Sequence, residues 1–371
     1  MKTRSQLLKS GSSSSNGPEN KLGSSCEKRF ATKFSSVSRL FTRLERLSLD
    51  LSSGPFRTQL KPLKAMPDCF KAGVVAITVV KNESGWLHHF LDHYRALGVS
   101  GFVIIDNGSD DGTSEHAIGE PDCLVLRADA SYGKAGFGSR WISAAVDLCG
   151  LRDRWLITAD VDELLVYNGC EHHQVDALTA LLESQSLMSL PSIILDVYAG
   201  ENDEPSANHG ACLVAGRRIM FDTQGYGRNP SLMDHMLIHR ALWIDGGPRA
   251  RRMFAEVRRR RIAPYLHKVP LMLWSAGTTL RNSHEADPVE MNFSPIRGAL
   301  LHLKLLDLDR LADPVRLESL EHWNNGVQYN VYRDQLGSDP GMSFVYEGSR
   351  YYDGSQSLTD RGLVSRLEWP E

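Results

Sequence analysis

The feature that most constrains this chain is an alternation of β-branched runs with amphipathic stretches. Residues 74–80 form a β-branched run of the kind found in strands buried on both faces. Residues 86–97 carry an apolar stripe at helical spacing that ends at Gly98, a residue suited to a helix C-cap. Further strands are expected at 102–105, 124–126 and 155–159, with a helix at 139–149. Strands alternating with helices predict an α/β fold with a parallel sheet and right-handed crossovers.

The chain is less regular after residue 175. We expect a helix near 175–182, a strand near 193–197, loops over the site in the Gly/Asn/Pro-rich stretch 198–232, and a helical region near 313–336. The pattern predicts three parts: an N-terminal segment at 1–66, the α/β domain at 67–305 and a helical C-terminal extension packed on it at 306–371.

The N-terminal segment differs from the rest in charge. Residues 1–66 carry 13 Lys/Arg against 4 Asp/Glu, whereas the remainder carries 29 against 41. Residues 1–33 are Ser-rich and too polar to bury a core, which predicts a disordered tail. Residues 34–51 have apolar side chains at helical spacing and predict an amphipathic helix. That helix could pack on the body or on a partner subunit, or lie on an anionic membrane surface.

Composition favours an enzyme-sized protein in the cytoplasm. With 371 residues and 42% apolar content the chain can bury a large core. The acidic body argues against a general nucleic-acid binder. The six cysteines form no CxxC pair, and we expect reduced thiols. The chain shows neither a signal-peptide h-region nor an apolar run long enough to span a membrane. We therefore expect a cytoplasmic protein. Residues 34–51 could in addition bring it to the inner face of the membrane.

Polar clusters follow three of the expected strands. They are Lys81-Asn82-Glu83, the run from Asp106 to Thr113, and Asp160-Val161-Asp162-Glu163. Ligands of open α/β sheets bind outside the carboxyl ends of the strands, so these clusters predict a site on one edge. Asp160 and Asp162 should point the same way, because side chains alternate in extended chain. A divalent cation would relieve their repulsion and bridge to phosphate oxygens.

Each cluster also has a plainer interpretation. A D-x-D pair taken alone is commonly a solvated surface pair. The Asp106–Thr113 run could bind an anion at a helix N-terminus, or it could be a solvent-facing turn in which Thr113 caps a helix. Glu83 could simply begin the following helix, where its charge suits the helix dipole.

The ordered set of clusters resembles family 2 glycosyltransferases of the GT-A fold. In particular it resembles the bacterial branch with K-N-E, D-N-x-S-x-D-G-T and D-x-D-E landmarks. The resemblance spans roughly residues 74–335. It also includes these later stretches: Gly246-Gly247-Pro248-Arg249, His267-Lys268-Val269-Pro270-Leu271, Ser283-His284 and Gly298 to Lys304. It implies a GT-A fold, with a Rossmann-like mixed sheet, and a nucleotide-sugar donor.

The resemblance also implies roles for individual residues. Glu83 and Asp106 would contact the base and ribose of the donor, with Lys81 and Asn107 beside them. Asp160 and Asp162 would hold Mg or Mn against the diphosphate, Asp160 lying against the nucleotide as well. Two further assignments are open: Arg140 near the donor phosphates or merely at a helix start, and His302 or His284 as a metal ligand or a core histidine.

Inverting transfer also needs a carboxylate that accepts the proton of the acceptor hydroxyl. Asp196, at the end of an apolar strand, is our preferred candidate, and Glu201, Asp203 and Glu204 also qualify.

The resemblance thus implies a metal-dependent glycosyltransferase that acts with inversion on a glycan or lipid-linked acceptor. Two alternatives stay open: a non-catalytic glycan- or nucleotide-binding protein with this fold, and a sugar nucleotidyltransferase. The latter should carry a Gly-rich basic loop after the first strand, where residues 80–85 are short and acidic. A dehydrogenase is disfavoured because no G-x-G-x-x-G follows that strand.

Overall fold

The computed structural model describes residues 55–200, 213–214, 216–232, 239–256, 262–313 and 326–370. All of them belong to one compact unit, Leu49–Glu371. The predicted tail at 1–33 and helix at 34–51 lie outside the described residues. So do Glu201, Asp203, Glu204 and the 314–325 part of the predicted C-terminal helical region.

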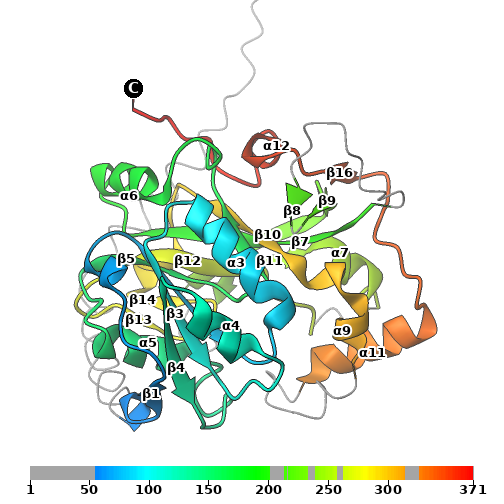
Figure 1. Ribbon diagram of the computed structural model, residues 1–371. Coiled ribbons are helices and arrows are strands. Elements are labelled where there is room, and N and C mark those ends of the chain that lie inside the picture. The colour runs from blue at the N-terminus through cyan, green and yellow to red at the C-terminus, as the bar shows by residue number, and fades with distance from the viewer. Residues whose placement is uncertain are drawn as a thin grey trace, which may run out of the picture. The chain divides into compact units, whose positions relative to one another are not determined.

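A large mixed sheet forms the centre of the fold (Figure 1). Its strand order is β1 (Leu60–Pro62), β4 (Cys123–Ala128), β3 (Gly101–Asp106), β2 (Val75–Val80), β5 (Arg154–Thr158), β12 (His267–Trp274), β7 (Ser189–Ala199), β15 (Gly298–His302) and β6 (Glu163–Val166). The strands β4, β3, β2 and β5 are parallel neighbours, as are β7 and β15. The pairs β1–β4, β5–β12, β12–β7 and β15–β6 are antiparallel.

The parallel arrangement expected from the alternation is thus confirmed for β4, β3, β2 and β5, and the rest of the sheet is mixed. The described helices are α3 (Ser84–Ala96), α4 (Thr113–Gly119), α5 (Ser139–Leu148), α6 (Val175–Ser184), α7 (Gly247–Arg252), α9 (Leu308–Ala312), α11 (Val327–Ser338) and α12 (Ser355–Thr359). Short 3-10 turns lie at η1 (Asp68–Lys71), η2 (Val289–Asn292) and η3 (Leu303–Leu306). The strands and helices predicted up to residue 197 all occur, each within a few residues of the expected ends.

The prediction of loops over 198–232 is wrong for its described part. This stretch contains β8 (Leu213–Val214), β9 (Arg217–Asp222) and β10 (Tyr226–Leu232). Strand β9 pairs with β7, β8 and β16 (Ser349–Tyr351). Strand β10 pairs with β11 (His239–Gly246), and β13 (Thr279–Leu280) pairs with β14 (Ala286–Asp287). Strand β9 has partners distant in the sequence, β7 and β16, whereas β8 and β10 pair with the strands that follow them. The local Gly/Asn/Pro content concealed all three strands.

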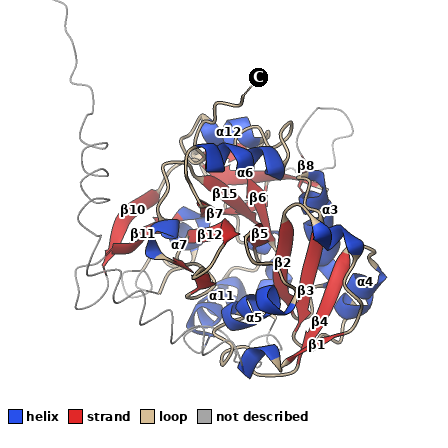
Figure 2. Ribbon diagram, turned by 90° about the vertical axis from the view of Figure 1, so that its left-hand side faces the viewer, coloured by secondary structure: helices blue, strands red, loops and turns tan. Residues whose placement is uncertain are grey.

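The two faces of the sheet bury different layers, which follows from the period of two along each strand. In β2, Ala76 and Val80 join a core with the side chains of α3 and α6, whereas Val75 and Ile77 join a second core with those of α5. Figure 2 shows α3 and α4 on one side of strands β2 to β4 and α5 on the other.

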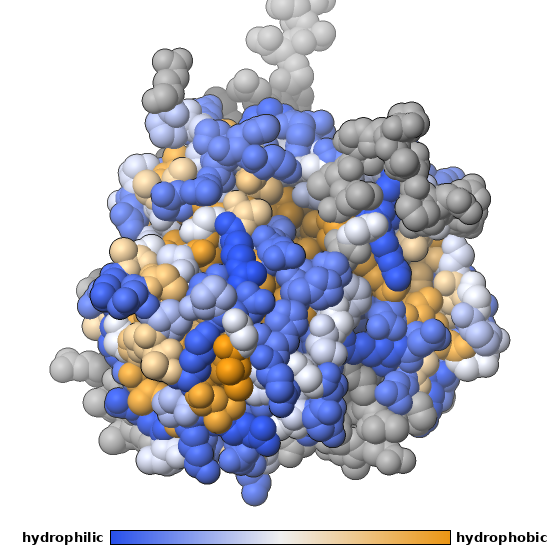
Figure 3. Space-filling model, in the orientation of Figure 1, coloured by the Kyte–Doolittle hydropathy of each residue, from blue (hydrophilic) through white to orange (hydrophobic). Residues whose placement is uncertain are grey.

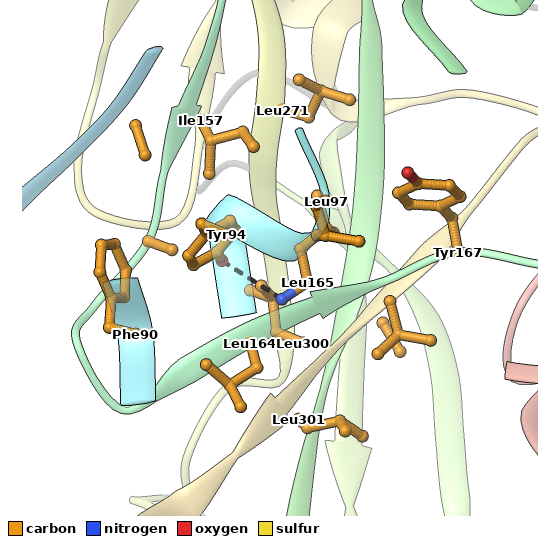
Figure 4. Packing of buried hydrophobic residues seen from close by; sticks show 14 of the residues in the cluster. Phe90, Tyr94, Leu97, Ile157, Leu164, Leu165, Tyr167, Leu271, Leu300 and Leu301 are labelled. Carbon is orange, nitrogen blue, oxygen red and sulfur yellow. Dashed lines mark hydrogen bonds between the residues drawn. The ribbon is translucent and has the colours of Figure 1, made fainter. Parts of the chain in front are cut away.

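Helix α3 also packs against strands β6 and β15 at the other end of the sheet. Phe90, Tyr94 and Leu97 pack in one cluster with the leucines of β6 and β15 (Figure 4). The Tyr94 hydroxyl donates to the Glu163 carbonyl at 3.0 Å and accepts from the Leu165 amide at 3.2 Å. This contact ties the start of β6, which directly follows Asp160 and Asp162, to a buried helix.

The C-terminal extension packs through a third core that includes Leu311, Tyr332 and Phe344. It is helical in α9, α11 and α12, but it also supplies the strand β16 next to β9.

Hydrophilic residues predominate on the face that carries α3 and α4 (Figure 3). No helix in the described ranges is long and apolar enough to cross a membrane. The described cysteines Cys69, Cys123, Cys149 and Cys170 are free thiols.

Candidate functional site

The polar clusters converge at the carboxyl edge of the parallel strands. Strands β2, β3 and β5 end at Val80, Asp106 and Thr158. Strand β12 runs antiparallel to β5, so its first residues, including Lys268, lie at the edge where β5 ends. On the other side, His302 is in register with Asp196 of β7 and with Glu163 of β6.

The first two loops are bonded to each other. Asn82 has a φ of 58°, in the left-handed region that Asn tolerates better than most residues. Its side-chain oxygen accepts from the Asp110 amide at 2.9 Å, and its own amide donates to the Ser109 hydroxyl at 3.0 Å. The Glu83 amide donates to the Thr113 hydroxyl at 2.8 Å. Hydrogen bonds therefore join the two loops, residues 81–83 and 106–113, into one rim, which the sequence did not predict.

The side chains of Asp106 and Asn107 both point inward and stabilise this rim through hydrogen bonds. The Asp106 side chain is fully buried; it accepts from the Ser109 amide at 3.1 Å and pairs with Arg127 at 3.3 Å. The Asn107 side chain donates to the carbonyls of Ala128 and Ala130 at 2.7 and 3.0 Å. These bonds show that both side chains stabilise the loop that follows β3.

Glu83 contacts the C-terminal extension. Its carboxylate forms an ion pair with Arg310 of α9, and the same guanidinium donates to the Asn82 carbonyl at 2.7 Å. Lys81 is exposed and makes no ion pair with the part of the chain that the structure describes. Arg140 is exposed too; it lies over the Phe56 ring at 5.3 Å and donates to the Lys134 carbonyl at 3.3 Å. The structure thus places Arg140 against the segment that precedes β1.

Asp160 forms an ion pair with a buried lysine. Nζ of Lys268 lies 3.3 Å from Oδ1 of Asp160 and 2.5 Å from Oε2 of Glu163. The Asp160 amide donates to the same Glu163 oxygen at 2.9 Å. Lys268 and Glu163 are each 3% exposed in their side chains, whereas Asp160 is 58% exposed. Burial opposes the charge on Lys268, but Asp160 and Glu163 outweigh it and raise its pKa, so the ammonium is charged.

Asp162 contacts a different partner. Its Oδ2 lies 3.4 Å from Nε2 of His302, and its carbonyl accepts from the Leu303 amide at 2.8 Å. Burial opposes ionisation of Asp162, but His302, Lys304 and Arg310 outweigh it and lower the pKa of the carboxyl. Burial likewise opposes the charge on His302, yet Asp162 and Asp196 raise its pKa above the usual value.

Asp196 contacts the inner side of the His302 ring, and its side chain is buried from solvent. Its Oδ1 is 2.7 Å from Nδ1 of His302, and its Oδ2 accepts from Nε of Arg249 at 2.7 Å. Arg249, itself buried, also donates to the Tyr332 hydroxyl of α11 at 3.1 Å. Burial opposes ionisation of Asp196, but Arg249 and His302 outweigh it and lower the pKa of the carboxyl. Both carboxylate oxygens are engaged, so this position suits orientation of His302 better than proton transfer from a substrate.

A shallow, open hollow adjoins Asp160 and Lys268. Its wall is mostly apolar and aromatic, with Val79, Tyr132, Phe137 and Ile142 on one part and Leu280 and Ser283 on another. His284 follows Ser283 with its Nδ1 2.7 Å from the His267 carbonyl. Burial and the nearby Lys268 lower the pKa of His284 to about 4, so it is neutral and donates to that carbonyl.

The residues fit a divalent cation in part. Asp162 and His302 present an oxygen and a nitrogen ligand side by side, and the Asp196 carboxylate behind His302 resembles the support that metal-binding histidines commonly have. Asp160 instead faces Lys268. Within the described ranges, no three or more His, Cys, Asp or Glu side chains are grouped to hold a metal ion.

Sequence reasoning missed three residues that organise this edge: Lys268, Glu163 and Arg249. All three lie inside stretches that carry the family resemblance, in His267–Leu271, Asp160–Glu163 and Gly246–Arg249. The available signal was a charged residue within an otherwise apolar or Gly/Pro-rich run, because a charge buried there needs a partner.

Comparisons with known proteins do not identify a family. No known family matches the sequence, and no curated protein matches it. Solved structures do match, among them "Crystal structure of 4-diphosphocytidyl-2C-methyl-D-erythritol synthase". That likeness covers 38% of this chain and 67% of the other, at 15% identity and a TM-score of 0.23. The protein is a mixed α/β protein with a central mixed sheet.

Proposed function

We propose that the protein is a glycosyltransferase that moves a sugar from a nucleotide-sugar donor to a hydroxyl of a glycan or lipid-linked acceptor, with inversion. One observation carries the proposal. Asp160 and Asp162 leave the end of β5 at the edge where Asn82 and Glu83 of the first loop and His302 of β15 also lie. An open hollow adjoins this edge. The carboxyl edge of an open α/β sheet is where such folds bind nucleotides.

Mn or Mg is part of the proposal, and Asp162 and His302 would hold it. When bound, the cation would offset the charge of a donor diphosphate and of the departing nucleotide. Asp196 fixes the His302 ring through Nδ1, and Nε2 would bind the cation after giving up the proton that faces Asp162.

Other residues have supporting parts in the proposal. Lys81 and Asp160 are exposed at the edge and are available to the donor. Glu83, Asp106 and Asn107 hold the rim on which the base and ribose would rest. Arg140 stands against Phe56, and its proposed contact with phosphate would require it to leave that ring.

The test uses the purified full chain with Mn and a panel of UDP-, GDP- and TDP-sugars. Release of nucleoside diphosphate is measured with and without hydroxyl acceptors. We expect release for at least one donor, and its loss in Asp162→Asn. Absence of both turnover and nucleotide binding by calorimetry would rule the proposal out. Glycan binding that persists without metal and in Asp162→Asn would instead identify a non-catalytic binding protein.

A further inference from the structure

The two aspartates of the D-x-D pair do not share one partner. Asp160 faces the Lys268 ammonium at 3.3 Å, whereas Asp162 faces the His302 imidazole at 3.4 Å. A D-x-D pair that jointly holds one metal would need both carboxylates turned to the same point. Here each carboxylate already has a separate cationic or metal-binding neighbour.

Lys268 is built into the fold and cannot easily turn away. It is the second residue of β12, the strand inserted between β5 and β7, and its side chain is 3% exposed. Glu163 holds its ammonium at 2.5 Å and also accepts the Asp160 amide at 2.9 Å. The lysine, the glutamate and the backbone and side chain of Asp160 therefore form a closed ring of contacts.

This ring satisfies the charge of Asp160 without a metal. An ammonium 3.3 Å from the Asp160 carboxylate repels a second cation brought to the same carboxylate. The opposite holds at Asp162, where His302 offers a nitrogen whose partner ring atom is already fixed by Asp196.

We propose that Lys268 is the resident cation of Asp160 and restricts divalent-metal binding to Asp162 and His302. Lys268 is thus a residue that sets the metal affinity of the site. The inference deepens the proposed function and rests on it for the identity of the metal. Its test, however, measures metal binding alone, with no donor and no turnover.

The experiment titrates the full chain with Mn and follows free Mn by electron paramagnetic resonance. The key variant is Lys268→Met with Glu163→Gln, which removes both buried charges and leaves the net charge unchanged. It frees the Asp160 carboxylate to act as a further oxygen ligand, so we expect Mn to bind about tenfold more tightly. Adding Asp160→Asn to that variant should abolish the gain.

Single substitutions keep the test decisive if the double variant does not fold. In the wild-type background we expect Asp160→Asn to leave Mn affinity within about twofold, and Asp162→Asn to weaken it by about tenfold or more. Equal weakening by the two substitutions would overturn the proposal. So would a folded double variant that binds Mn no better than the wild type, including the case where neither binds.

The outcomes separate this inference from the proposed function. A wild type that binds no Mn beside a double variant that does would overturn the assignment of the metal to Asp162 and His302, because that assignment requires binding in the wild type. Failure of all nucleotide sugars to turn over would remove the glycosyltransferase proposal and leave the Mn titration to decide the role of Lys268.

Discussion

Nδ1 of His302 lies 2.7 Å from Oδ1 of Asp196, and both side chains are buried. The bond joins β15 to the parallel strand β7 at the residue where β15 ends. It also continues through Arg249 to Tyr332 in the C-terminal extension. The candidate metal ligand is therefore oriented by groups that never reach the surface.

Substitution of Asp196 should destabilise the protein strongly. Asp196→Asn leaves Arg249 as a buried charge without a counter-charge, which costs about 3 to 5 kcal/mol. Urea denaturation followed by circular dichroism measures the loss. The double variant Asp196→Asn with Arg249→Met removes both charges and should lose less than Asp196→Asn alone. A single variant as stable as the wild type would show that the ion pair does not stabilise this core.

Glu83 and Arg310 should be energetically coupled. Their ion pair is 18% exposed on each side and joins the start of α3 to α9. We expect a double-mutant cycle of Glu83→Gln and Arg310→Met to give a coupling of about 0.5 to 1 kcal/mol. Denaturation midpoints of the four proteins measure it. Additive effects of the two substitutions would mean that the extension is held by its apolar core alone.

Acid should destabilise the protein partly through His267. Burial, His284 and Arg297 lower the pKa of His267 in the folded state to about 3, below the usual value of about 6.5. The unfolded state therefore takes up this proton first. The contribution of His267 is complete above about pH 6.5 and is lost toward pH 3, by at most about 1.4 kcal/mol per pH unit.

His267→Leu tests this dependence. Nε2 of His267 is buried and has no hydrogen-bond partner among the described residues, so leucine removes no bond from that atom. Stability measured by urea denaturation should fall less steeply between pH 6.5 and 4 than in the wild type. His172→Gln, at an exposed position, serves as the control and should keep the wild-type slope. An unchanged slope in His267→Leu would contradict the assignment.

Two glycine substitutions should have opposite signs. A Cβ at Gly298 would come within 2.9 Å of the Val166 carbonyl oxygen, a backbone atom that cannot turn aside, so Gly298→Ala should destabilise by about 1 to 3 kcal/mol. A Cβ at Gly85, in the first turn of α3, meets nothing within 4 Å. Gly85→Ala should stabilise by about 0.5 kcal/mol, since alanine loses less entropy in a helix. Shifts of the urea midpoint in the same direction would count against this account of β15.

The sequence by itself determined strands β2, β3, β4, β5 and β7, helices α3, α5 and α6, and the three polar clusters that follow β2, β3 and β5. Strands β1 and β6 were not predicted. Strand and helix periods are local, and residues 74–80 or 86–97 carry them without reference to distant partners. The position of Asp160 and Asp162 after a buried strand was equally local, because it depends only on where β5 ends.

Only the tertiary structure decided which residues meet at that edge. Lys268 pairs with Glu163 across 105 residues, and His302 with Asp196 across 106. Both pairs depend on the order of the strands, with β12 inserted antiparallel between β5 and β7, and β15 placed between β7 and β6. No local pattern encodes that order, because it follows from how the whole chain buries its apolar faces and satisfies its buried charges.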